Sequence, residues 1–305
     1  MKRKNTAVMC VLLALTFFPS CDTQRLGQFA AFATAGSQYV TAFHQLTAQA
    51  GSAMIAIDSV VLITAHNQVS SDLKANPSKY ESEVVSHDQL LQTYLANLQL
   101  LDEHATQLGS YFDAISNLAD GKAASGTSAA ATDLLNSIEA LSPSVAKATF
   151  LGKSVQDYVT TGTPLVVAHF EVTALDDQLK KAAPVIDTAL SLQEAAVAAI
   201  GSQLKASLGD TLSASETNEV VDPYLQTTEL PANWNTNREA FLRAKVTLGN
   251  LDSAQAAIKQ LHITFKQLVE DKNASIDLTT LLNDITKMAG YANSLESSLK
   301  SSNSK

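Results

Sequence analysis

Apolar residues recur at alternating steps of four and three along the first proline-free stretch after residue 24. This stretch, residues 25–74, carries the stripe Phe32, Gly36, Tyr39, Phe43, Leu46, Ala50, Ala53, Ile57, Val60 and Thr64. The spacing predicts a long helix with one apolar face, because residues three or four positions apart lie on the same side of an α-helix. At 1.5 Å per residue this helix would span roughly 75 Å.

A second stripe predicts another long helix over residues 79–119. Its members are Val84, His87, Leu91, Tyr94, Leu98, Leu101, Ala105, Leu108, Phe112 and Ile115, and this is the most regular spacing in the chain. Between the two stretches Pro77 interrupts the helical pattern, and Ser78 is a suitable N-cap for the second helix. The two stripes together indicate a helical hairpin.

The later prolines divide the rest of the chain into further helical regions. We expect helices at residues 128–160, interrupted at Pro143, and at residues 164–208, with Pro184 inside the second. Residues 209–235 hold two prolines and the only tryptophan of the chain. They are expected to form an irregular connection.

Two more apolar stripes follow. Residues 236–272 carry Phe241, Leu248, Leu251, Ile258, Phe265 and Leu268, and residues 276–300 carry Leu278, Leu281, Ile285, Met288, Ala292, Leu295 and Leu299. No stretch alternates with period two for long enough to predict a sheet. The predicted fold is all-α, an elongated antiparallel up-and-down bundle of about five or six long helices with coiled-coil-like heptad packing. A disordered tail is expected at residues 301–305.

The N-terminus has the organisation of a signal peptide. Three positive residues at positions 2–4 precede an apolar run at residues 7–18, and "PSC" ends at Cys21. The run is too short to span a membrane, which needs about 18 apolar residues. A small residue before a cysteine resembles the signal of bacterial lipoproteins. The resemblance implies cleavage before Cys21, a diacylglycerol on its thiol and attachment to the cell envelope. An ordinary secreted protein and an uncleaved anchor are the alternatives.

This interpretation divides the chain into a signal peptide at residues 1–20, a lipidated tether at residues 21–25 and one helical domain at residues 26–300. The whole chain holds 21 Lys and Arg against 30 Asp and Glu. Loss of the signal removes three positive charges and leaves a net charge of −12. Such a charge argues against nucleic acid as a partner and against binding to anionic lipid. Cys10 leaves with the signal, so the mature domain has no pair of cysteines for a disulfide.

No motif in the sequence predicts a catalytic residue, a cofactor site or a metal site. "LGKS" at residues 151–154 ends like a phosphate-binding loop, but Lys147 stands where that loop needs a glycine. We expect its Lys and Ser to lie on the surface of a helix. None of the six histidines has a Glu three positions before it, as helical-bundle metal sites have. Glu83 and His87 share a helix face but would need ligands from other helices.

His87 and His262 fall on apolar stripes. We expect both to be imidazoles at the edge of the core with hydrogen-bond partners, and a pH-responsive role or metal binding is the alternative. Asp102, Glu103 and His104 place two carboxylates beside an imidazole. Consecutive helical residues point in different directions, so a solvated helix face is expected there.

One segment of the first helix, "AMIAIDSVVLI" at residues 53–63, is apolar on nearly every side. Its candidate core or interaction residues are Ala53, Met54, Ile55, Ile57, Asp58, Val60, Val61, Leu62 and Ile63. A helix that is apolar all round is either enclosed by neighbours or meets lipid or a partner. We expect enclosure on every side, with Asp58 at a groove edge reaching a Lys, an Arg, a hydroxyl or a backbone donor. A membrane-binding or partner-binding surface is the alternative.

These features favour a non-enzymatic, lipid-anchored protein of the cell envelope. It would act as a helical scaffold or spacer that binds another envelope component, and it would reach the membrane through lipid on Cys21. A helical membrane-interacting or pore-forming type of protein is the first alternative, and an enzyme of unrecognised type is the second. The sequence leaves the oligomeric state open.

Overall fold

The computed structural model describes residues 21–69, 76–120, 129–130, 132–133, 136, 149–150, 153–154, 175–249, 251–270 and 276–303. The expected signal peptide at residues 1–20 lies outside these residues. So do the start of the predicted fourth helix, residues 164–174, and most of the predicted third helix. The fold described below is therefore that of the remaining chain.

The chain is all-α, as its periodicity predicts. Its long helices are α1 (Cys21–Val69), α2 (Pro77–Ala119), α5 (Leu175–Ser215), α7 (Trp234–Gly249), α8 (Leu251–Glu270) and α9 (Leu278–Asn303). A π-helical turn, η1 (Glu216–Val221), and a short helix, α6 (Asp222–Gln226), lie between α5 and α7. The only strands among the described residues are β1 (Thr149–Phe150) and β2 (Lys153–Ser154).

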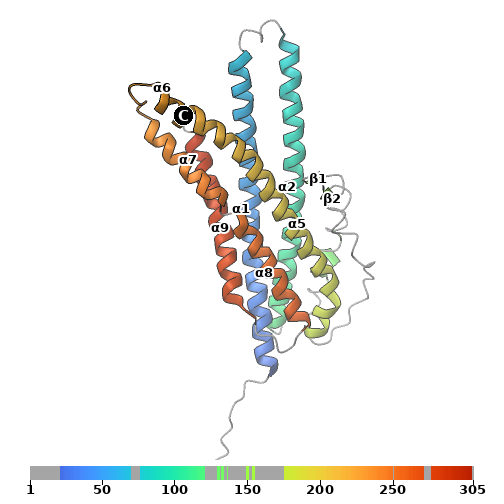
Figure 1. The fold of residues 1–305 in the computed structure, drawn as a ribbon. Helices are drawn as coiled ribbons and strands as arrows, with labels where there is room; N and C mark the ends of the chain where they lie inside the picture. The colour runs from blue at the N-terminus through green and yellow to red at the C-terminus, as the bar shows by residue number, and fades with distance from the viewer. Residues whose placement is uncertain are drawn as a thin grey trace, which may run out of the picture.

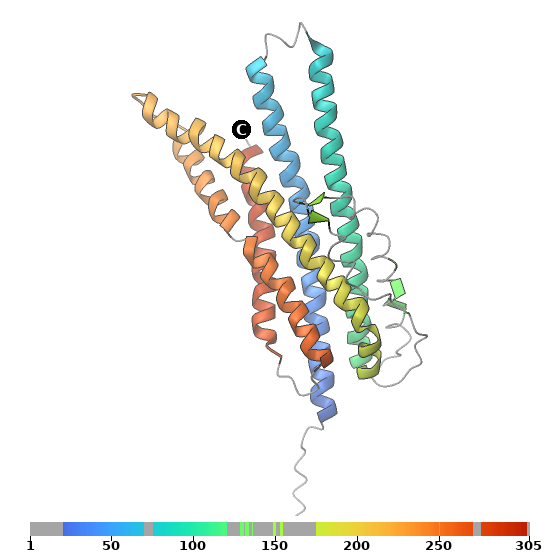
Figure 2. The same ribbon diagram turned by 45° about the vertical axis from the view of Figure 1, so that its right-hand side comes forward.

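The long helices run along an elongated molecule: α1, α5 and α9 run in one direction, and α2, α7 and α8 run in the other (Figure 1). Helix α1 lies at the centre and packs against α2, α9, α5 and α8. Towards the upper end of Figure 1, α5 and α7 lean away from α1 and α2, and Figure 2 shows the same divergence from a second direction. The molecule thus has one closed end, where α1 begins, and one end where two arms separate.

The core is one continuous cluster that runs from Phe29 to Leu295. The ring of Phe32 meets the ring of Phe112 edge-on at 5.5 Å between centroids and lies 6.0 Å from the ring of Phe265. Gly36 makes this packing possible, because a Cβ there would fall 2.5 Å from the Phe112 ring. A small residue on α1 therefore lets the aromatic layer of α2 approach the helix backbone closely.

Two predicted elements differ from the structure in the second half of the chain. The expected helix at residues 236–272 is two helices, α7 and α8, and the break follows Gly249, a poor helix former that commonly ends helices. The expected irregular connection at residues 209–235 is helical as far as Gln226. Pro223 is tolerated there because it lies in the first turn of α6, directly after the π-helical turn η1, and not in the interior of an α-helix.

The helix expected around residue 150 is wrong in its described part. Thr149 pairs with Ser154, and Phe150 pairs with Lys153, in an antiparallel arrangement. Two residues, one of them Gly152, separate the paired segments, which is the commonest length for a β-hairpin loop. The Lys and Ser of "LGKS" therefore lie in a strand and not on a helix.

Both ends of the described chain are helical. Residues 21–25, expected as a tether, form the first turns of α1. The Arg25 guanidinium donates a hydrogen bond to the Leu268 carbonyl and lies 4.5 Å from the centroid of the Phe29 ring. At the other end, α9 continues to Asn303. The prediction of a disordered tail at residues 301–305 is therefore wrong for residues 301–303. Ser and Asn cost helices only a few tenths of a kcal/mol each.

Candidate interaction surface

The hairpin of α1 and α2 extends past the other helices, and we call this extension the distal arm. It comprises residues 53–69 of α1 and residues 77–97 of α2. In Figures 1 and 2 no third helix of the described chain runs beside its upper part. The apolar stripe of α1 is buried without interruption from Phe32 to Ile57, whereas Val60 is 41% exposed. The core therefore ends at the base of the arm.

The expectation that residues 53–63 are enclosed on every side is wrong. Ala53 and Ile57 are buried, and Met54, Asp58 and Leu62 are half-buried. The remaining large apolar side chains, Ile55, Val60, Val61 and Ile63, are between 41% and 60% exposed. The reason is geometric. At this height α1 packs mainly against α2, and a helix with one neighbour can bury only one face.

Helix α2 also carries exposed apolar residues along the arm. Val84 and Val85 are 44% and 47% exposed, and Leu90 is 74% exposed. Asp58 lies opposite His87, and the two helices are antiparallel. Val60 and Val61 therefore lie at about the height of Val84 and Val85. Apolar side chains from both helices thus gather on one section of the arm.

A hydrogen bond between Asp58 and His87 joins the two helices of the arm. His87 Nδ1 lies 2.6 Å from Asp58 Oδ1, and both side chains are partly buried. Asp58 thus lies at the edge of the apolar contact, as expected, but its partner is a histidine and not a Lys, an Arg, a hydroxyl or a backbone group. The prediction that His87 is a core-edge imidazole with a partner is confirmed.

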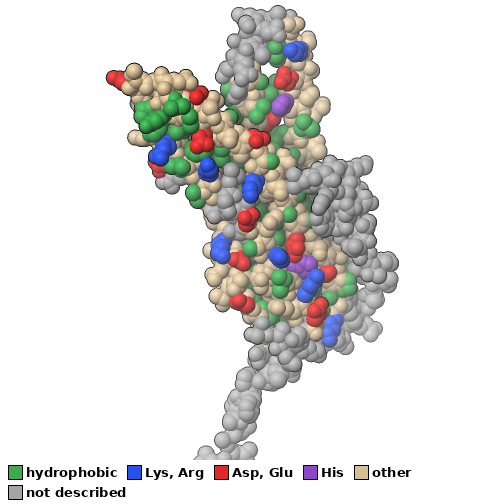
Figure 3. Space-filling model, viewed as in Figure 1, with side chains coloured by type: hydrophobic (Ala, Val, Ile, Leu, Met, Phe, Trp, Pro, Cys, Tyr) green, Lys and Arg blue, Asp and Glu red, His purple; other side chains and the backbone are tan. Residues whose placement is uncertain are grey.

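A second exposed apolar cluster lies on the other arm, and we call it the α6–α7 tip, residues 221–246. Its exposed members are Val221, Tyr224, Leu225, Leu230, Leu242 and Val246. Figure 3 shows apolar side chains gathered over this tip, at the upper left, and a notch between it and the distal arm. Sequence reasoning missed this cluster, because residues 209–235 were expected to be irregular. The lone Trp234 and the "PYL" at residues 223–225 were the available signals.

Trp234 fixes the shape of the tip. Its indole Nε1 donates a hydrogen bond to the Val220 carbonyl of η1 at 2.9 Å, and its ring stacks on Tyr224 at 5.9 Å. The Arg238 guanidinium lies 5.8 Å from the centroid of the Trp234 ring. The start of α7 is thereby tied to η1 and α6, so the exposed side chains sit on an ordered framework.

His262 joins α8 to α5. Its Nδ1 lies 2.6 Å from Glu194 Oε1, its Nε2 lies 2.6 Å from Asp187 Oδ1, and Lys266 also pairs with Asp187 at 3.2 Å. Burial lowers the pKa of His262, but the hydrogen bonds to the two carboxylates outweigh burial and raise it above its usual 6.5. The prediction that His262 has hydrogen-bond partners is confirmed. The carboxylates hold opposite ring nitrogens, so the three groups do not converge on a metal position.

Asp102, Glu103 and His104 do point in different directions, but the expected solvated face is wrong for His104. Glu103 is exposed, and Asp102 bonds across to His44 Nδ1 at 2.5 Å and to Thr47 Oγ1 at 2.9 Å on α1. His104 is completely buried. Asp102 therefore joins α2 to α1, whereas His104 lies in the core.

The buried His104 belongs to a polar chain across the core. Gln193 Nε2 donates to His104 Nδ1 at 2.8 Å, and the Tyr39 hydroxyl donates to Gln193 Oε1 at 3.1 Å. Burial lowers the pKa of His104 to about 4, so the imidazole is neutral at pH 7. Its Nε2 has no hydrogen-bond partner among the described residues.

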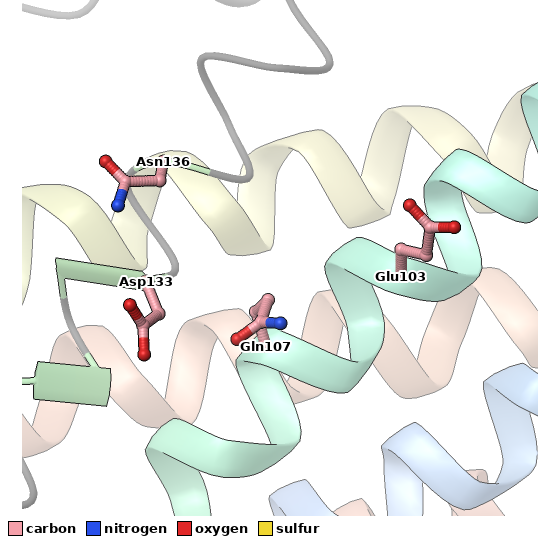
Figure 4. Close-up of a pocket in the computed structure, with 4 residues that line it drawn as sticks. All are labelled: Glu103, Gln107, Asp133 and Asn136. Carbon is pink, nitrogen blue, oxygen red and sulfur yellow. The ribbon is translucent and has the colours of Figure 1, made fainter.

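A shallow hollow of about 380 Å³ lies beside α2, lined by Glu103, Gln107, Asp133 and Asn136 (Figure 4). Its lining is polar: in Figure 4 Glu103 and Gln107 come from α2, and Asp133 and Asn136 come from a separate segment beside it. Within the described ranges no group of three or more His, Cys, Asp or Glu side chains is placed to hold a metal ion.

Two described stretches, Arg25–Ile63 and Ala182–Gln226, are long and apolar enough to cross a membrane by length and composition alone. Core helices of soluble proteins also meet this criterion, so it is weak support for a membrane span. Comparison with known proteins does not add a family: no family model, curated protein or solved structure matches the chain. A function for the two arms must therefore be argued from their exposed side chains, their charges and their contacts.

Proposed function

We propose that this chain is a non-enzymatic, lipid-anchored protein of the cell envelope, a helical spacer that holds a binding surface away from its membrane. The distribution of exposed apolar residues carries the proposal. Of the sixteen large apolar side chains exposed in the described residues, seven lie on the distal arm and six on the α6–α7 tip. Both surfaces lie toward the end of the molecule away from Cys21 (Figure 1).

The separation of the two ends supports a spacer. Helix α1 begins at Cys21 and contains 49 residues, so its far end lies about 70 Å from a lipid on that cysteine when the helix stands upright. Contiguous apolar surface in water favours association with another molecule. An anchor at one end and apolar arms at the other suit a protein that reaches a second envelope component.

The pairing of the titratable side chains is consistent with a structural role. His44, His87 and His262 each bond a carboxylate on another helix. Such contacts hold helices together. A catalytic acid or base must instead reach a substrate from a cleft.

One observation favours a second candidate, a helical membrane-interacting protein. The apolar stretch Arg25–Ile63 includes the exposed part of α1. If the arms insert into lipid, the mature chain should release dye from loaded vesicles. On the spacer proposal it should not, since the chain is strongly acidic and has another binding partner.

Photocrosslinking in intact cells tests the spacer proposal. A photoreactive side chain at Val61 or Tyr224 should capture an envelope protein, whereas the same group at Asn283, exposed on the lower part of α9, should not. Cys21→Ser should abolish capture by releasing the protein, and mass spectrometry should find diacylglycerol on Cys21. Equal capture at Asn283, or an unmodified Cys21 in the mature protein, would contradict the proposal.

A further inference from the structure

His262 of α8 bonds two carboxylates of α5 at once, one at each ring nitrogen. Its Nε2 lies 2.6 Å from Asp187 Oδ1, and its Nδ1 lies 2.6 Å from Glu194 Oε1. An ionised carboxylate only accepts hydrogen bonds, and a neutral imidazole carries a single N–H. The two contacts can therefore both be hydrogen bonds only when the imidazole holds its second proton.

The ring lies at the contact between α8 and α5, and only 9% of its side chain is exposed. The charged groups that act on it are the two carboxylates of α5 and Lys266 of α8 itself. Helices α1 and α9 also pack against α8, but among the described residues neither contributes a charge that shifts the pKa of His262. From α1 the Tyr39 hydroxyl lies near Glu194, and burial followed by that carboxylate raises its pKa well above 10, so it stays neutral.

Loss of the proton would affect the two carboxylates unequally. Asp187 has a second cation beside it, since Lys266 Nζ lies 3.2 Å from Asp187 Oδ1. In the described part of the chain Glu194 has no cation other than His262. With a neutral ring one carboxylate faces a nitrogen lone pair instead of an N–H. Because Lys266 ties Asp187 to α8 in either state, the attachment that depends on the proton is that of Glu194.

Glu194 is also the contact nearer the α6–α7 tip. It stands seven residues beyond Asp187 on α5, which is about 10 Å along the helix. From Glu194 the chain continues through the rest of α5, η1 and α6 to Gln226. These elements and α7 form the second arm, which leans away from α1 and α2 (Figures 1 and 2). Helix α8 is the helix against which α5 packs most extensively, so the seat of α5 on α8 sets the direction of this arm.

We propose that His262 is a proton-operated latch for the second arm: the imidazolium holds α5 to α8 at Asp187 and at Glu194, and loss of its proton frees Glu194 while Asp187 remains on Lys266 as a pivot. The arm is then seated in mildly acidic solution and tilts more freely as the pH rises. From Glu194 to Gln226 the helices span about 48 Å, so a tilt of about 5° moves the tip by about 4 Å. The distance between the two arms thus depends on pH, whatever either arm binds.

Distances between spin labels test the latch in the mature chain carrying Cys21→Ser, in which only introduced cysteines are labelled. Labels at Gln226→Cys on the tip and Ser52→Cys on α1, both exposed positions, should give a distribution that shifts or broadens by about 3 Å or more between about pH 6 and about pH 9. The pair Ser52→Cys and Asn283→Cys, which joins α1 to α9, should not change. An unchanged tip distance, or an equal change in the control pair, would overturn the proposal.

Glu194→Gln separates the latch from a merely structural contact. The amide of Gln can donate to an unprotonated Nδ1 and accept from a protonated one, so this variant should keep the seated distance at both pH values. Asp210→Asn, the same kind of change at an exposed position of α5, should keep the pH dependence of the parent chain. Circular dichroism verifies that both variants fold. An arm that is loosened at both pH values by Glu194→Gln, or that still moves with pH, would contradict the latch.

The parent chain alone provides the last test. Nitrogen-15 chemical shifts of the imidazole, assigned by comparison with His262→Gln, report protonation of each ring nitrogen. Both nitrogens of His262 should carry protons at about pH 6, and their titration should have the same midpoint as the change in tip distance, within about half a pH unit. A ring that is neutral at about pH 6, or an arm movement with a different midpoint, would overturn the proposal.

Discussion

His104 and Asp102 stand two residues apart on α2 and meet opposite environments. Asp102 reaches across to His44 and Thr47 at the half-exposed surface of the hairpin. His104 points inward to Gln193 and is completely buried. The helical twist between neighbouring positions decides which side chain is solvated and which must stay neutral.

His104 should make the fold less stable in acid. Its pKa falls from 6.5 to about 4 on folding, so the unfolded chain binds the proton more readily and stability declines as the pH falls from 6.5 towards 4. At about pH 5 the imidazole should cost roughly 2 kcal/mol of unfolding free energy. Urea denaturation should show a smaller loss between about pH 7 and pH 5 in His104→Gln than in the parent chain. The exposed control His66→Gln should keep the parental dependence, and identical profiles for all three proteins would refute the role of burial.

His262 should act in the opposite direction. Its pKa is raised on folding, so its contribution to stability is fully present below the unfolded pKa of about 6.5 and is lost as the pH rises through the folded value. The lowered pKa of Asp187 extends the effect down towards pH 4. His262→Gln should therefore reduce the unfolding free energy more at about pH 6 than at about pH 8.5 in urea denaturation. A larger loss at the higher pH would show that protonated His262 does not bridge the two helices.

Helices α1 and α2 pack closely because glycines on each face the other helix. Gly36 faces the ring of Phe112, and Gly109 faces Val40, which would lie 3.3 Å from a Cβ at that position. Spacing placed Gly36 on the predicted stripe of α1, whereas Gly109 lies off the predicted stripe of α2. Close approach of two backbones is a property of the pair, not of either helix.

Gly36→Ala should destabilise the fold. The new Cβ would fall 2.5 Å from the ring of Phe112, so the ring or the helix must move, at a cost of about 1–3 kcal/mol or more. The same change at Gly290, which has open space around its Cβ position on α9, should stabilise by up to about 1 kcal/mol through helix propensity. Thermal denaturation of the two variants compares them directly, and a stabilised Gly36→Ala would show that α1 and α2 pack less closely.

Helix α2 runs from the core into the distal arm. Truncation of its leucines should show where along the helix burial ends. Leu98 is buried at 4% exposure and Leu90 is 74% exposed. Leu98→Ala should therefore cost about 2–5 kcal/mol of unfolding free energy, whereas Leu90→Ala should stay within about 0.5 kcal/mol. Chemical denaturation measures both. Similar losses at the two positions would mean that the arm is as enclosed as the body.

At the scale of the whole molecule, periodicity predicted the helices and their inward faces. The α1 stripe from Phe32 to Ile57 and the α2 stripe from Leu98 to Ile115 are buried at every position, because a regular apolar spacing can be satisfied only by a packed face. The same spacing could not show where the core ends. Val60 and Val84 continue the stripes and are exposed, since their burial depends on how far α5 and α9 stay beside α1. The sequence near Val60 and Val84 carries no signal that shows where helices distant in the chain diverge.

The candidate surface was identified in part for the same reason. Composition singled out residues 53–63 as either core or interaction surface, but it favoured enclosure and overlooked the contribution of Val84, Val85 and Leu90. The α6–α7 tip was missed because prolines were taken to end helices. Pro223 instead begins one. Pairings between distant helices, such as Asp58 with His87, become apparent only when the register of the hairpin is known.

Hydrogen–deuterium exchange of the mature chain, followed by mass spectrometry, tests the central claim most directly. If the distal arm is an exposed binding surface, residues 53–69 and 77–97 should exchange much faster than residues 98–115 in the free protein, because few neighbours protect the arm from local opening. Exchange in the arm that is already as slow as in the body, in a chain that sediments as a monomer, would contradict the account.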